Sequence, residues 1–388
     1  MRSGNSAEKI VLAYGDRQTF RYRCEDIHFA GFTALTLPTR RSEWRLNGGA
    51  PTHFYIERQT TEADPRCYPW DTRTPAVNRL LDLPGHFNIE IPVESPQLRA
   101  GHNRIGLAIE GQDGVQAQLE ATFTWDPSAP GLPLDVSDLS KIQTIQDVAQ
   151  VVDGLWDVDR AHNAIKTRAP VAADSLCLLG APHASQEAIY DVEFSSPLDG
   201  FFVGLSDFFV RHDEQVPSIG IKPGYSSAGL ATLRPGGFAE CWVAMGDNTW
   251  ENDWAWVRKT RIPAVVSIAA GVVYTVRHQV IFDGGTIVSR FRLWRAGRPE
   301  PKGWLCTINT ASLSPNLPRP TAASFGLFQH RGNPTRWSNI KLRPIPARIT
   351  PEDLVSNHPA VAGWNALRYY GRRLSQRARR KVRNLVGD

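Results

Sequence analysis

The sequence predicts an all-β protein with two β-sandwich domains followed by a basic amphipathic helix. Its 388 residues exceed one average domain, which favours two. Its 31 Gly and 28 Pro supply many turns, and 12 Trp and 16 Phe beside 2 Met favour short strands over long helices. Because 41% of the residues are hydrophobic and only 21% are charged, a disordered chain is excluded.

Residues 1–130 are predicted to form the first sandwich, of fibronectin or immunoglobulin type. Short apolar or alternating segments between residues 9 and 125 are separated by turn residues, a spacing typical of such folds. Within them, residues 98–109 resemble the strand edge of fibronectin type III-like accessory modules. The Pro-rich run 126–133 follows, so we expect the domain linker there.

Residues 139–347 are predicted to form the second and larger sandwich. Apolar residues at Leu139, Ile142 and Ile145 have helical spacing, which predicts a short helix over residues 139–150 that bridges the domains. From residue 151 to 345 the pattern returns to short strands with long loops. One large jelly roll accounts for this pattern.

Two segments of the second unit carry a family resemblance. Residues 152–158 (VDGLWDV) resemble the opening strand of concanavalin A-like lectin/glucanase domains. Residues 325–342 resemble the closing strands of those domains, and they are also similar to the end of the 3-keto-disaccharide hydrolase-like family. The resemblance spans about half of the chain and implies a jelly-roll sandwich. That fold carries lectins, glycosidases, lyases and structural modules, so no single activity is implied.

Polar residues alternate with apolar ones along four predicted strands. If these polar faces share one concave sheet, they form a groove in which Trp rings stack on sugars and Arg side chains bind hydroxyls. We therefore expect recognition of a glycan or polysaccharide. The alternative is a solvated sheet face with cross-strand ion pairs. The predicted ligand-binding residues on these strands are Trp242, Arg277, Gln279, Arg290, Arg292 and Trp294.

Three carboxylates on these strands allow an enzymatic alternative. Glu240 with Asp191 or Glu193 would form the acid/base pair of a glycoside hydrolase or polysaccharide lyase if the carboxyls lie about 5 to 10 Å apart. The chain lacks the Glu-x-Asp-x-x-Glu strand of laminarinase-type enzymes, and its Arg277-His278-Gln279 reverses the Gln-x-His order of alginate-lyase-type sandwiches. Binding and catalysis therefore both stay open, as does a structural adaptor that binds only proteins.

Two loops add candidate residues. The loop 246–256 contains Trp250 and Trp254 among acids, which is typical of a sugar-stacking lip or of a contact between domains. Its oxygens would suit Ca²⁺, but the ordered spacing of a calcium loop is missing, so we predict no metal or cofactor. His212 lies beside two acids, which suits acid/base work or a solvated turn.

Residues 350–388 are predicted to be a helical basic tail with one apolar stripe. Its end, residues 368–388, holds eight Lys or Arg and one acid and contributes +7, whereas the whole chain has a net charge of +5, so residues 1–367 carry −2. The tail suits an anionic membrane surface or an acidic protein, or it docks on its own sandwich; no nucleic acid is expected. The residues that would make this contact are Arg372, Arg373, Arg377, Arg379, Arg380, Lys381 and Arg383.

The sequence also bears on the compartment. The first residues lack the apolar run of a signal peptide, and the five cysteines are dispersed without metal-ligand spacing. We therefore expect a cytoplasmic protein with reduced cysteines, which the tail would hold at the inner membrane face beside the assembly of cell-surface polysaccharide.

Overall fold

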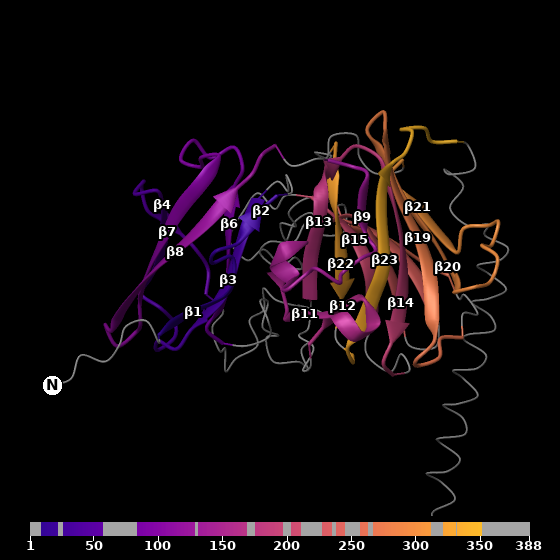
Figure 1. The fold of residues 1–388 in the computed structure, drawn as a ribbon. Helices are drawn as coiled ribbons and strands as arrows, with labels where there is room; N and C mark the ends of the chain where they lie inside the picture. Colours follow the sequence, from indigo (N-terminus) through magenta and orange to yellow (C-terminus); the bar gives the residue numbers. More distant parts are fainter. Residues whose placement is uncertain are drawn as a thin grey trace, which may run out of the picture.

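The computed structural model describes residues 9–21, 26–56, 84–128, 131–168, 175–196, 203–210, 227–234, 238–244, 257–262, 267–311, 321–330 and 332–350. Over these residues the chain forms β-strands, and its helical elements are two single 3-10 turns (Figure 1). The all-β prediction is confirmed. No helix in this part of the chain is long and apolar enough to cross a membrane. The predicted tail helix and the residues His212, Trp250 and Trp254 lie outside the described residues.

The N-terminal strands form two sheets around one apolar core. Phe29 and Ile89 on the first sheet face Ile105 and Phe123 on the second, and all four are fully buried because alternate residues of each strand point inward. The first sheet has the order β1 (Ile10–Tyr14), β3 (Asp26–Thr33), β6 (His86–Pro92), and the second has the order β2 (Thr19–Phe20), β8 (Gln116–Trp125), β7 (Gly101–Glu110), β4 (Arg41–Leu46), β5 (Thr52–His53). We call this pair of sheets the N-terminal sandwich.

The remaining strands form a seven-stranded and an eight-stranded sheet, which we call the C-terminal sandwich (Figure 1). The seven-stranded sheet has the order β10 (Gln150–Asp153), β13 (Ser175–His183), β22 (Ala323–Gln329), β15 (Val203–Phe209), β16 (Ser227–Arg234), β17 (Phe238–Ala244), β18 (Val257–Ile262). The eight-stranded sheet has the order β11 (Trp156–Asp159), β12 (Ala164–Thr167), β23 (Thr335–Pro344), β14 (Gln186–Phe194), β19 (Val273–Asp283), β20 (Thr286–Arg295), β21 (Cys306–Asn309), with β9 (Leu134–Val136) paired to β23.

A single core fills the space between these two sheets. Trp156 and Trp337 pack with ring centroids 5.4 Å apart, and both are buried. The centre of the core is polar: the Tyr190 hydroxyl donates to Ser206 Oγ at 2.8 Å, and Ser206 Oγ lies 2.6 Å from His278 Nδ1. These hydrogen bonds satisfy polar groups that would otherwise be costly to bury.

The predicted bridging helix over residues 139–150 is wrong. Strand β9 ends at Val136 and β10 begins at Gln150, and the segment between them contains only the 3-10 turn η2 (Ile145–Asp147). Asp147 caps this turn by accepting hydrogen bonds from the backbone of Gln143 and Thr144 at 2.9 and 2.8 Å. The apolar residues with helical spacing instead point into the sandwich core, where Leu139 and Ile145 are buried.

The two sandwiches contact each other through buried hydrogen bonds. The Trp156 backbone N–H donates to the Tyr14 hydroxyl at 2.8 Å, and the side chain of Gln150 donates to the Asp26 carbonyl at 3.0 Å. Tyr14 also belongs to the core of the C-terminal sandwich. The proposed domain boundaries, residues 1–130, 139–347 and 350–388, stay a prediction.

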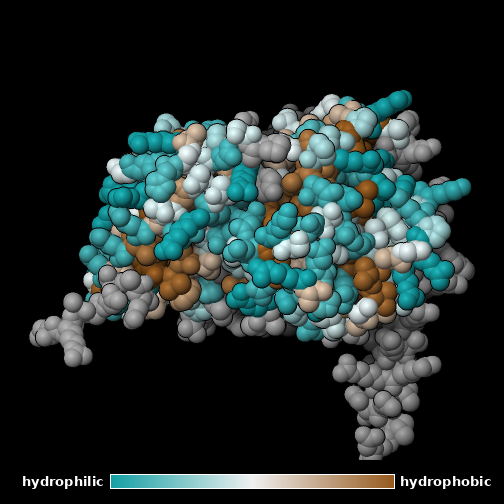
Figure 2. Space-filling view, viewed as in Figure 1, coloured by the Kyte–Doolittle hydropathy of each residue, from teal (hydrophilic) through white to brown (hydrophobic). Residues whose placement is uncertain are grey.

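Figure 2 shows the side of the molecule seen in Figure 1. Hydrophilic side chains predominate over β12 and β23 of the C-terminal sandwich, whereas hydrophobic side chains gather over β1 of the N-terminal sandwich. There Val11 and Phe32 face each other across β1 and β3 and are 37% and 38% exposed.

Candidate functional site

The predicted acid/base carboxylates lie on different sheets of the C-terminal sandwich. On β14, Tyr190 and Val192 point into the core, so Asp191 and Glu193 point outward from the eight-stranded sheet. On β17 the core residues are Ala239, Cys241 and Val243, so Glu240 and Trp242 point outward from the seven-stranded sheet. The expectation that these polar faces share one sheet is therefore corrected. The sandwich core separates Glu240 from both of its predicted partners.

Five of the predicted ligand-binding residues do share one face, the outer face of the eight-stranded sheet, which we call the polar face. The register brings its residues into rows, because residues directly opposite each other in antiparallel strands point to the same side. These rows are Arg343–Glu187–Gln279–Arg290, Lys341–Ile189–Arg277–Arg292, and Asp191–Thr275–Trp294.

Glu187 is the centre of the first row. Its carboxylate is 1% exposed and lies 2.6 Å from Nη1 of Arg277 and 2.6 Å from Nη2 of Arg343, and it also accepts a hydrogen bond from Gln279. Burial by itself raises the pKa of Glu187, but the hydrogen bonds from Arg277 and Gln279 and the charge of Arg277 outweigh burial, so the pKa lies below its ordinary value. The carboxylate therefore holds these side chains in fixed positions.

The segment between β20 and β21 adds Glu300 and Trp304 to the polar face. Glu300 accepts two hydrogen bonds from Arg277, at 2.8 and 2.9 Å, and it pairs with Arg292. The guanidinium carbons of Arg290 and Arg292 lie 4.4 and 4.1 Å from the centroid of Trp304. Neither residue was predicted from the sequence, although Trp304, like the Trp residues that singled out the loop 246–256, stands in a polar segment.

Asp191 stands at one end of the third row. Thr275 Oγ1 donates to its Oδ1 at 2.6 Å, and Asn339 Nδ2 donates to its Oδ2 at 2.7 Å. Asn339 has a φ of +52°, a left-handed conformation that Asn tolerates better than most residues. The partly exposed Trp294 completes this row. The row thus combines an indole with a carboxylate, an amide and a hydroxyl.

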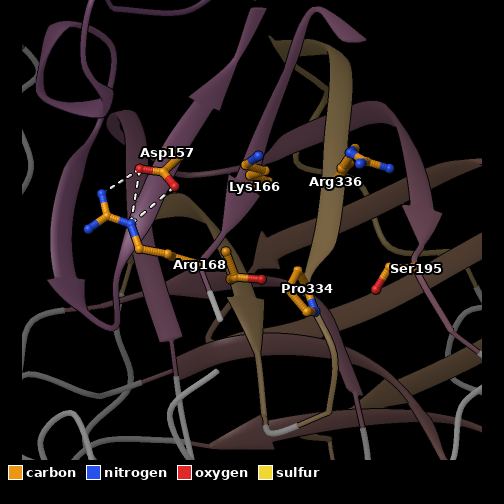
Figure 3. Close-up of a pocket in the computed structure, with 7 residues that line it drawn as sticks. Asp157, Lys166, Arg168, Ser195, Pro334 and Arg336 are labelled. Carbon is orange, nitrogen blue, oxygen red and sulfur yellow. Dashed lines mark hydrogen bonds and ion pairs between the residues drawn. The ribbon is translucent and has the colours of Figure 1, made fainter. Parts of the chain in front are cut away.

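A pocket of about 320 Å³ opens where the polar face meets β11 and β12 (Figure 3). Its charges are paired. Arg168 Nε donates to Oδ2 and Oδ1 of Asp157 at 3.1 and 3.2 Å. Arg336 binds Asp159 at 3.1 Å and Glu193 at 3.0 Å. This pocket could not be predicted from the sequence, because it depends on the pairing of β12 with β23, a strand that is distant in sequence. It is lined by Asp157, Lys166, Thr167, Arg168, Ser195, Pro334 and Arg336.

The opposite, outer face of the seven-stranded sheet carries Glu240 and Trp242. Glu240 is buried and accepts a hydrogen bond from the Trp242 indole at 3.1 Å. Trp242 packs against an apolar cluster that includes Phe209 and Leu230. On the same face Asp207 accepts a hydrogen bond from Ser227, and burial raises the pKa of Asp207 to about 7. Trp242 is therefore apart from the other predicted ligand-binding residues.

The remaining predicted site residues are outside the described part of the chain. These are His212, Trp250 and Trp254 and the basic residues of the tail between 372 and 383. Among the described residues no group of three or more His, Cys, Asp or Glu could hold a metal ion.

Comparisons with known proteins give only remote likenesses. No protein-family model and no curated protein matches the chain. Among solved structures, carbohydrate-binding module CBM66 from Bacillus subtilis is 15% identical, with a TM-score of 0.31 over 50% of this chain and 94% of that one. An alginate lyase from Pseudomonas aeruginosa is 9% identical (TM-score 0.31, 49% and 86%). An endo-1,3-beta-glucanase from Streptomyces sioyaensis is 8% identical (TM-score 0.30, 54% and 88%). Likenesses at these scores carry no conclusion about function.

Proposed function

We propose that this protein recognises carbohydrate on the polar face of its C-terminal sandwich. The observation that carries this proposal is the row in which Trp294 lies in line with Thr275 and Asp191 on adjacent strands. The row provides an apolar ring next to a fixed array of hydrogen-bonding groups. This combination suits a sugar, whose C–H groups stack on an indole while its hydroxyls need donors and acceptors.

The ion pairs of the polar face support recognition rather than oppose it. Glu187 and Glu300 hold Arg277, and Arg292 is held by Glu300 and by the ring of Trp304. Side chains fixed in this way lose little conformational entropy when a ligand binds. Because an Arg side chain has five N–H groups, more than these pairs use, Arg277 and Arg292 can also donate to a ligand.

The pocket of Figure 3 adjoins this face through Arg336, which bonds to Glu193 next to the Asp191 row. Because the acidic and basic groups around it are paired, the pocket offers hydrogen bonds without a strong field of one sign. We propose that it receives one end of an extended glycan whose other units cross the polar face.

A glycan array followed by calorimetry on the best ligand tests the proposal. We expect Trp294→Ala and Asp191→Asn each to weaken binding about tenfold or more, which corresponds to ~1.4 kcal/mol. Arg104→Ala is the matched control, because Arg104 is an exposed charged residue on the N-terminal sandwich with a weak partner 3.6 Å away. The proposal fails if the wild-type protein binds no glycan, or if neither variant changes affinity. A protein that binds no glycan but retains a stable protein partner would be the structural adaptor.

A further inference from the structure

Two buried cysteines lie on facing sheets of the C-terminal sandwich. Cys241 is on β17 of the seven-stranded sheet, and Cys306 is on β21 of the eight-stranded sheet. Both have an exposed fraction of 0% and both belong to the core between the sheets. The third described cysteine, Cys177 on β13, lies in the same core and hydrogen-bonds to the backbone of Leu327.

The thiols of Cys241 and Cys306 lie within hydrogen-bonding reach of each other. The Cys241 thiol takes part in hydrogen bonds with the Cys306 thiol and with the hydroxyl of Ser289, which lies on β20 beside β21. The sheets also approach closely at this point: a Cβ atom added to Gly229 on β16 would lie 2.7 Å from Ser289 Oγ. The absence of that Cβ lets two strands from different sheets bring their side chains together.

A disulfide needs its two Cβ atoms about 3.8 Å apart and its sulfurs about 2.05 Å apart. Two thiols on facing strands that hydrogen-bond to each other are placed to approach to this geometry. A disulfide between the two sheets of a sandwich is an arrangement that immunoglobulin domains also use. Burial, and then the hydrogen bond with Cys306, raises the pKa of the Cys241 thiol, so the folded protein exposes no reactive thiolate here. Oxidation must therefore take place while the chain folds.

We propose that Cys241 and Cys306 form a disulfide across the core of the C-terminal sandwich when the chain folds in the presence of a small disulfide oxidant such as oxidised glutathione. One cysteine thiolate attacks the oxidant, forms a mixed disulfide and releases one glutathione thiolate. The second cysteine thiolate then displaces the other glutathione. The S–S bond of oxidised glutathione breaks, the S–S bond between the cysteines forms, and the two thiol protons and two electrons leave with two molecules of reduced glutathione. This inference is independent of the proposed carbohydrate recognition.

Refolding the full chain in a glutathione redox buffer tests this proposal. A Cys24→Ser/Cys67→Ser background limits exchange with the cysteines that the structure does not describe. We expect the oxidised protein to lose about 2 Da, and a non-reducing peptide map to link Cys241 to Cys306. The melting temperature should be higher than that of the reduced protein by about 5 °C or more, because the bond restricts the unfolded chain.

Two variants sharpen the result. Cys177→Ser removes a buried thiol that hydrogen-bonds to the backbone of Leu327, and it should leave the loss of mass and the cross-linked peptide unchanged. Cys306→Ala should abolish both. The background protein retains three thiols, those of Cys177, Cys241 and Cys306. The proposal is overturned if the protein refolds but all three thiols can still be alkylated after denaturation, or if the cross-link joins Cys177 to another cysteine.

Discussion

Glu187 and Arg277 form an ion pair on adjacent strands, with 2.6 Å between Oε1 and Nη1, in which the carboxylate is almost completely buried. The same carboxylate also binds Arg343. Because a buried charge is tolerated only with partners, removing this one leaves two guanidiniums without their common acceptor. The pair therefore joins β14 to β19 and β23 and stabilises the polar face.

We expect Glu187→Gln to lower the free energy of unfolding by about 2 kcal/mol, because the amide keeps the volume but loses the charge. Urea denaturation at pH 7 measures this change. Glu120→Gln is the control, since Glu120 is 70% exposed and its pair with Arg104 should contribute less than about 0.5 kcal/mol. Equal effects of the two substitutions would contradict the role given to Glu187.

The stability that Glu187 provides should depend on pH. Its folded-state pKa is below the ordinary value of 4.5, so its contribution is fully present above that value and disappears as pH falls through the folded pKa. Urea midpoints measured from pH 6 down to pH 3 should therefore converge for the wild type and Glu187→Gln. A difference that stays constant over this range would show that the charge is not responsible.

The strand content and the inward or outward direction of side chains could be predicted from the sequence, because alternation is a local property of each strand. Asp191 and Tyr190 on β14 illustrate this, as do Glu240 and Cys241 on β17. The assignment of these strands to different sheets could not be predicted, because it depends on pairing between strands that are distant in the sequence.

Irregular segments explain the other differences. Trp304 and Glu300 come from a segment without periodicity, so only the folded chain shows that they contact Arg292. The helical spacing of Leu139 and Ile145 arose because a buried irregular segment also needs recurring apolar residues.

His28 should make the protein sensitive to acid. It is 1% exposed on β3, its Nδ1 lies 3.3 Å from the Asn88 side-chain oxygen, and its Nε2 has no hydrogen-bond partner among the residues that the structure describes. Burial lowers the pKa of His28 from 6.5 to about 4, despite the hydrogen bond with Asn88. The unfolded chain therefore binds a proton between pH 6.5 and 4 that the folded chain does not, and stability falls as pH decreases through this window.

The full effect of His28 is about 3 kcal/mol below pH 4, from a pKa difference of about 2.5 units. His278, whose pKa burial lowers to about 3, adds a second contribution of the same sign. We expect His28→Gln to flatten the dependence of the unfolding free energy on pH between 6.5 and 4. His162→Gln should not, because this side chain is 53% exposed. An unchanged slope in His28→Gln would contradict the burial of the neutral imidazole.

Tyr14 should hold the two sandwiches together. Its hydroxyl accepts the Trp156 N–H at 2.8 Å and lies 3.4 Å from the Trp156 carbonyl. Tyr14→Phe leaves this buried N–H without an acceptor, so we expect a loss of about 1 to 2 kcal/mol and faster hydrogen exchange of the Trp156 amide. Exchange measured by NMR tests this directly.

Tyr274→Phe is the comparison for Tyr14→Phe. The Tyr274 hydroxyl bonds to the backbone of Ser267 and Ala269 within the C-terminal sandwich, at 3.1 and 2.9 Å. Its loss should cost a similar free energy but leave exchange at Trp156 unchanged. If both variants accelerate exchange at Trp156 equally, the effect is global and Tyr14 has no special role at the contact.

The basic tail, residues 350–388, remains a prediction from the sequence. Its last 21 residues contribute +7 to the net charge, and each basic residue near an anionic lipid surface contributes about 1 kcal/mol to binding. Truncation after Pro359 should therefore abolish sedimentation with vesicles that contain phosphatidylserine, and 0.5 M salt should do the same to the full chain, because it screens these charges.

The triple variant Arg372→Gln/Arg373→Gln/Arg377→Gln should weaken sedimentation without altering the melting temperature. If the truncated protein sediments as well as the full chain, or if these three substitutions lower the melting temperature instead, the tail docks on its own sandwich rather than on a membrane.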